Sequence, residues 1–132
     1  MKASDLMIGD WVLYENKPTG VSEISYYNDD DPTICVWGTN YVADEKEIAP
    51  IPLTDEILEK NGFVDVGQQV LQYEDGLYWV WYELDTHRLG IDANNNSWDG
   101  ESTTPMLRVV IFDVHQLQHA LHLCGIDKEI VL

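Results

Sequence analysis

The clearest hydrophobic pattern in the chain is a short apolar run followed by a periodic stretch. Residues 109–112 are continuously apolar and mostly β-branched, which is typical of a strand covered on both faces. After this run the apolar residues recur every three or four positions, and the spacing predicts a helix over 113–124. Asp113 is the predicted N-cap, and Gly125 the residue that ends the helix. The apolar stripe consists of Val114, Leu117, Ala120, Leu121 and Cys124.

The first part of the chain shows a different pattern, in which short apolar or alternating runs are separated by turn residues. Strands of this length and spacing are typical of a small barrel. Ile8–Gly–Asp–Trp–Val12 also resembles the first strand of SH3-like barrels. The aspartate-rich stretch 28–32 predicts a solvated turn. The predicted strands are 11–14, 21–27, 33–37, 41–42 and 47–48.

Two prolines, Pro50 and Pro52, mark a boundary, because proline removes backbone donors and stiffens the chain. Thr54 then caps a short helix that ends at Asn61–Gly62, with Phe63 folding back onto it. We therefore predict an α+β fold. A small SH3-like β-barrel (1–52) precedes a unit (53–132) in which the short helix is followed by an antiparallel sheet packed on the C-terminal helix.

The sheet of the second unit begins with a predicted hairpin over 69–84, whose turn is Asp75–Gly76. Its return strand is rich in aromatic residues and carries large side chains on both faces. Two interpretations are open: a platform that stacks a flat ligand, or rings that fill the core. Residues 86–91 and 129–132 predict further strands. One face of the return strand carries Leu77, Trp79 and Trp81, and the other carries Tyr78, Val80, Tyr82 and Leu84.

Charge is the strongest compositional signal. The 132 residues include 24 acidic and 7 basic residues, a formal net charge of −17. Such a field repels phosphate backbones and anionic membrane surfaces, so direct binding to nucleic acid or to a membrane is not expected. The charge either serves solubility or offers an acidic surface to a basic protein partner, in the manner of a DNA mimic.

The two cysteines, Cys35 and Cys124, lie within apolar patterns. Buried thiols in a reducing compartment are therefore expected rather than a disulfide. The sequence shows neither the pattern of a secretory signal nor an apolar run of membrane-spanning length. We expect a cytoplasmic protein.

Three histidines form a second stripe on the predicted C-terminal helix. His115, His119 and His122 are spaced four and three residues apart, and histidines one turn apart can bind zinc. The helix has no H-E-x-x-H pattern, so a half-exposed polar flank is the competing interpretation. No cofactor is expected. A loop beginning at Asp92 has the first three ligand positions of a calcium loop, but Ser97 replaces the required glycine.

Three pieces of the sequence together resemble a known group of proteins. They are Lys2–Ala–Ser–Asp–Leu–Met–Ile–Gly–Asp–Trp–Val12, Ile51–Pro–Leu–Thr–Asp–Glu–Ile–Leu–Glu–Lys–Asn–Gly–Phe63, and the helix that opens with Val114–His–Gln–Leu–Gln118. In order and spacing they resemble a family of small, mostly uncharacterised proteins of phages and prophages of gut anaerobic bacteria. This resemblance implies an accessory protein of a mobile element and supplies no catalytic residues.

From these observations we expect a non-enzymatic binding protein, in its most concrete form a counter-defence protein that sequesters a small nucleotide-like signal. Three alternatives stay open: an acidic decoy that binds a host protein, a hydrolase with a metal on the three histidines, and a structural part of the virion. Self-association into a homo-oligomer is also open. The expected ligand-binding residues are Tyr78, Trp79, Trp81, Tyr82, Arg88, Arg108, His115 and His119.

Overall fold

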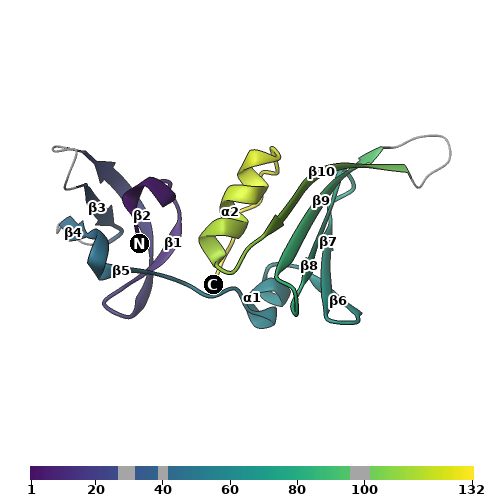
Figure 1. Ribbon diagram of the computed structural model, residues 1–132, viewed down its shortest axis with the longest axis horizontal. Coiled ribbons are helices and arrows are strands. Elements are labelled where there is room, and N and C mark those ends of the chain that lie inside the picture. The colour runs from purple at the N-terminus through teal and green to yellow at the C-terminus, as the bar shows by residue number, and fades with distance from the viewer. Residues whose placement is uncertain (27–31, 39–41, 96–101) are drawn as a thin grey trace. The chain divides into compact units, whose positions relative to one another are not determined.

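The computed structural model describes residues 1–26, 32–38, 42–95 and 102–132. Most of the turn expected at 28–32, Tyr41, and residues 96–101 of the calcium-like loop lie outside these ranges. The first part of that loop was predicted wrongly, because residues 92–95 belong to a strand, β9 (Arg88–Asn95). The fold is mostly β, with two antiparallel five-stranded sheets (Figure 1). The α+β prediction is therefore wrong, because α2 (Val114–Leu123) is the one helix of seven or more residues within the described ranges.

The chain divides into two compact units. The first comprises Met1–Pro52 together with Asp113–His119, and the second comprises Leu53–Phe112 together with Ala120–Leu132. The residues of α2 are thus shared between them, whereas the sequence-based division placed the whole helix in the second part.

The sheet of the first unit has the strand order β4-β3-β2-β1-β5. Its outer strands β4 and β5 each pair with one neighbour in the described part of the chain, so the sheet does not close and the SH3-like barrel is not formed. Strand length and spacing are visible in a sequence, but closure depends on tilt and stagger, which short strands do not encode. The elements are η1 (Ala3–Asp5), β1 (Trp11–Tyr14), β2 (Lys17–Ser25), β3 (Thr33–Val36), β4 (Val42–Asp44), η2 (Glu45–Glu47) and β5 (Ile48–Pro50).

A small apolar core holds this unit together. Side chains of all five strands and of η1 contribute to it, and seven of its eight members are 3% exposed or less, so water is excluded from the centre of the unit. Trp37 adds to the packing by lying flat against Gly20 of β2, where a Cβ would come within 2.5 Å of the indole. The core residues are Ala3, Leu6, Val12, Val21, Ile34, Val36, Ala43 and Ile48.

The sheet of the second unit has the order β10-β9-β8-β7-β6. The predicted hairpin is confirmed: β7 and β8 pair, and the Asp75 carboxylate accepts hydrogen bonds from the backbone N–H groups of Leu77 and Tyr78. Gly76 has a positive φ of 89°, as the tight turn requires. The elements are α1 (Asp55–Lys60), β6 (Val64–Gly67), β7 (Val70–Glu74), β8 (Tyr78–Glu83), β9 (Arg88–Asn95) and β10 (Ser102–Val110).

Two strand predictions in this unit are wrong. The apolar run at 109–112 is not covered on both faces: β10 is an edge strand, and Val110 and Phe112 are 50% and 53% exposed. Residues 129–132 form no strand. Instead, the Asn61 side chain holds Val131, donating to its carbonyl oxygen and accepting from its N–H, both at 2.8 Å.

The two faces of the second sheet differ in burial. Cross-strand partners lie on the same face, so the pairs Tyr82–Leu89 and Val80–Ile91 define the buried face. The pairs Trp81–Gly90 and Glu83–Arg88 define the opposite, outer face.

Hydrogen bonds confirm two of the predicted helix ends, the start of α1 and the end of α2. The Thr54 hydroxyl accepts from the Ile57 N–H at 3.2 Å, which confirms the predicted N-cap of α1. At the end of α2, the N–H of Gly125 donates to the carbonyl oxygen of His122, and the N–H of Ile126 donates to that of Leu121. This pair of hydrogen bonds is the Schellman motif. The predicted apolar stripe of α2 is buried along its whole length.

None of the helices in the described ranges is long and apolar enough to cross a membrane.

Candidate functional site

The outer face of the second sheet carries a stack of Trp81, Gly90 and Arg108. These residues are aligned across β8, β9 and β10. The indole of Trp81 lies flat over Gly90, where a Cβ would come within 2.1 Å of the ring. The guanidinium carbon of Arg108 lies 4.2 Å from the ring centroid, a cation–π contact. Because Gly90 has no side chain, the Trp81 ring can lie directly against the backbone of β9.

Arg108 is held in place by three further hydrogen bonds. Its Nη2 donates to the Asp92 carboxylate at 2.7 Å, and its Nη1 donates to the carbonyl oxygens of Leu107 at 2.8 Å and Ile91 at 3.3 Å. The side chain nevertheless stays 48% exposed. Arg108 thus presents a fixed guanidinium plane to solvent.

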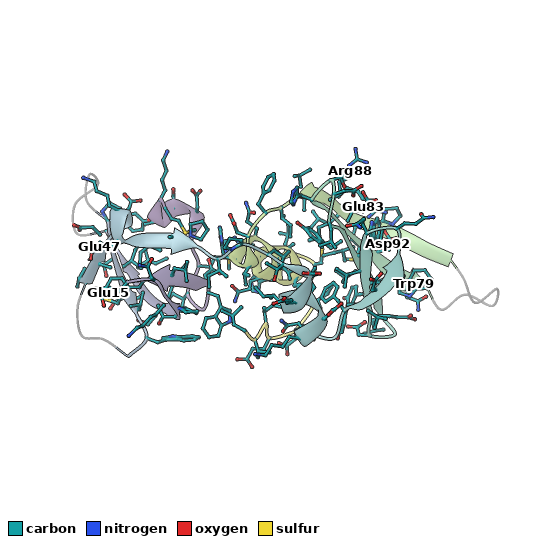
Figure 2. All side chains as sticks on the ribbon, turned by 90° about the horizontal axis from the view of Figure 1, so that it is seen from below. Glu15, Glu47, Trp79, Glu83, Arg88 and Asp92 are labelled. Carbon is teal, nitrogen blue, oxygen red and sulfur yellow. The ribbon has the colours of Figure 1, made fainter. Side chains whose placement is uncertain are left out.

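A hollow of about 390 Å³ lies beside this stack. We call it the arginine hollow. It contains both arginines of the chain, Arg88 and Arg108. Figure 2 shows Arg88 beside Glu83, its partner across β8 and β9. Since Asp92 neutralises Arg108, the charges around the hollow balance, in a chain whose net charge is −17. The lining residues are Trp81, Glu83, Arg88, Leu89, Arg108, Val109 and Val110.

The aromatic residues predicted to bind ligand are divided between the two faces. Trp79 shares the outer face with Trp81, and its buried Nε1 has no hydrogen-bond partner within the described ranges. Tyr78 and Tyr82 lie on the opposite face. Tyr82 is 1% exposed, and its hydroxyl contacts His87 Nδ1 at 3.0 Å and the Ile111 carbonyl oxygen at 3.1 Å. Tyr82 is therefore a core residue.

Two of the predicted histidines, His115 and His119, belong to the first unit, where they line a different hollow. His119 Nε2 lies 2.6 Å from Oδ2 of Asp10, which also accepts from the Met7 N–H at 2.8 Å. Asp10 is 2% exposed. Gln118 fixes the same turn by accepting from the N–H of Trp11 and donating to the carbonyl oxygen of Gly9. Two adjacent side chains of α2 thus hold the turn that precedes β1.

His115 is buried next to this pair, with its ring centroid 5.6 Å from that of His119. Burial lowers the pKa of His115, and the negative charges of Asp10, Asp113 and Asp5 only partly oppose this effect. A lowered pKa means that the imidazole is neutral at pH 7. Its Nδ1 is buried without a hydrogen-bond partner among the described residues.

The hollow around these residues has a volume of about 680 Å³. We call it the histidine hollow. His122, in contrast, is exposed and does not line it. In the described ranges, no three His, Cys, Asp or Glu side chains are grouped so that they could hold a metal ion. The lining residues are Met1, Ser4, Asp5, Leu6, Met7, Pro50, Asp113, His115, Gln116 and His119.

The two cysteines are free thiols, as expected. Cys124 is buried, and burial raises the pKa of its thiol, which makes it a weak nucleophile. Cys35 is half-buried.

Sequence reasoning missed Asp10 and Gly90. Asp10 precedes a strand like many turn residues, and its partner His119 lies 109 residues away. Nothing in the sequence around Gly90 indicated its role, because that role depends on the Trp81 ring of the neighbouring strand β8. Comparison of the chain with protein-family models, curated proteins and solved structures finds no match, so the two hollows are interpreted from their own geometry.

Proposed function

We propose that this chain is a non-enzymatic binding protein whose second unit binds a small flat anion of the nucleotide class in the arginine hollow. The observation that carries the proposal is the fixed Arg108 guanidinium stacked on Trp81, with the chain's other arginine in the same hollow. Bases stack readily on guanidinium planes as well as on aromatic rings. Arg88, which is exposed, is available to contact a phosphate.

The charge around the hollow favours a ligand with few phosphates. Glu83 and Asp92 offset the two arginines, and the remaining field of the chain is strongly negative. A polyanion such as a nucleic-acid strand is repelled by this field, whereas one or two phosphates on a stacked base meet a local balance of charge. We further propose, on the resemblance described above, a counter-defence role in the cytoplasm of a phage-infected bacterium.

Isothermal titration calorimetry with adenosine monophosphate, adenosine and ribose 5-phosphate tests this proposal. We expect saturable binding of the nucleotide and weaker binding of either fragment, since stacking and charge both contribute. Arg88→Gln should weaken nucleotide binding about tenfold, the effect of one lost charge-assisted contact.

Lys128→Gln provides a matched control. Lys128 also places a cation over an aromatic ring of the second unit, 4.4 Å from the centre of Tyr73, but it does not line the arginine hollow. Its substitution should leave nucleotide binding unchanged. Equal losses in the two variants, or no saturable binding to the intact chain, would refute the proposal.

A further inference from the structure

The histidine hollow of the first unit is not used by the proposed nucleotide site and has a different charge. Three carboxylates, those of Asp5, Asp10 and Asp113, lie close enough to His115 to act on its charge. Two groups oppose them. The amino group of Met1 donates to the carbonyl oxygens of Glu45 and Ile48 at 3.0 and 3.1 Å, and His119, which lies 2.6 Å from Asp10, lowers the pKa of His115. The hollow is therefore negative, in contrast to the balanced arginine hollow.

His115 adds an acceptor to this negative environment. A neutral imidazole has one nitrogen that accepts and one that donates, and burial keeps His115 neutral. The side chain is 5% exposed and lines the hollow, while its Nδ1 lacks a partner among the described residues. A buried polar atom without a partner is costly, so a bound group that donates hydrogen bonds is favoured here in the tautomer whose Nδ1 accepts.

The rest of the lining suits an alkyl chain. Leu6, Met7 and Pro50 provide apolar surface beside the carboxylates. A charged head on a short hydrocarbon stem presents the same combination, because such stems pack along apolar surface while the head keeps polar partners.

We propose that the histidine hollow binds a primary alkylammonium group, with its head among Asp5, Asp113 and His115. The group belongs either to a free amine or to a lysine side chain of a partner protein. This inference is independent of the nucleotide proposal, since it concerns the other unit and a ligand of opposite charge.

Imidazole resonances give a direct test on the intact chain. We expect n-butylammonium chloride to shift the ring signals of His115 and His119 in a saturable manner and to leave His87 unchanged. The uncharged analogue n-butanol should produce no comparable shift. Absence of a saturable shift, or an equal shift with n-butanol, would overturn the proposal.

The same titration with a lysine derivative blocked at both ends distinguishes the two sources. Tighter binding of the lysine derivative than of n-butylammonium would assign the site to a partner's lysine, and the opposite order would assign it to a free amine. Either order supports an ammonium site.

Variants that lack the carboxylates of the hollow provide a second test of the ammonium site. Asp5→Asn with Asp113→Asn should weaken n-butylammonium binding about tenfold, and asparagine at 113 preserves the capping ability of this position. Asp55→Asn with Asp127→Asn is the matched control, because these exposed aspartates belong to the second unit. Amide spectra check folding, and the single Asp5→Asn variant replaces the pair if the pair unfolds. Unchanged affinity in the hollow variant would overturn the proposal.

Discussion

Replacing Gly90 by alanine should displace the Trp81 indole from its position over residue 90 of the second sheet. An added Cβ would lie 2.1, 2.2 and 2.4 Å from three ring carbons, whereas ordinary contacts begin near 3.4 Å. The ring must therefore move by at least about 1.3 Å, the difference between 3.4 and 2.1 Å. The movement also disturbs the contact between the ring and the Arg108 guanidinium.

The effect of this substitution on the free energy of unfolding can be estimated from three contributions. Overpacking a well-filled site costs about 1–3 kcal/mol, and loss of a cation–π contact at a half-exposed site costs about 0.5–1 kcal/mol. Alanine recovers about 0.5–1 kcal/mol, because glycine in a strand loses more backbone entropy on folding. We expect a net decrease of about 1–3 kcal/mol in the free energy of unfolding.

Urea denaturation followed by circular dichroism measures this change, and the Trp81→Ala background provides the control. Without the indole, the three atoms nearest to the new Cβ are gone, so Gly90→Ala should be neutral or slightly stabilising in that background. An equal loss with and without Trp81 would refute the reasoning, because the cost would then arise elsewhere.

Three further predictions follow from the packing and the charges. Thr54→Ala should lower the free energy of unfolding by about 1 kcal/mol through loss of the N-cap of α1, and Thr54→Ser should restore most of it; equal stability of all three proteins in urea would contradict the cap. Leu58→Ala, at a residue with 0% exposure, should cost about 2–5 kcal/mol in the same assay. Because the pKa of His115 is lowered in the folded protein, the unfolded chain binds the extra proton more readily. Stability should therefore fall as the pH decreases below about 6.5, and less steeply in His115→Gln; identical profiles would contradict a neutral His115.

Local features of the fold could be read from the sequence because their causes lie within a few residues. The cap at Thr54, the Asp75–Gly76 turn and the glycine end of α2 each depend on one side chain or one permissive φ angle. The helical stripe of α2 was equally visible, because a period of 3.6 residues needs no partner to be recognised.

The fold class and the sites depend on contacts between distant residues. The apolar run at 109–112 reads as a central strand, yet its position at a sheet edge is set by pairing with β9 alone. The strands at 64–67 and 102–108 were not predicted, because the first is only four residues long and ends in glycine, and Pro105 interrupts the second. The β content was therefore underestimated. The ligand residues were expected to form one site, but the histidines and arginines line hollows of different units.

The confinement of both arginines to one hollow has a practical consequence for chemistry on this protein. A dicarbonyl reagent selective for guanidinium groups can modify only Arg88 and Arg108, so any adduct reports on the arginine hollow without mutagenesis. The two adducts should form at different rates, because Arg108 is engaged by Trp81 and Asp92 whereas Arg88 is exposed. Arg88 therefore offers a place to attach a spectroscopic label at the rim of the hollow while the stack behind it stays intact.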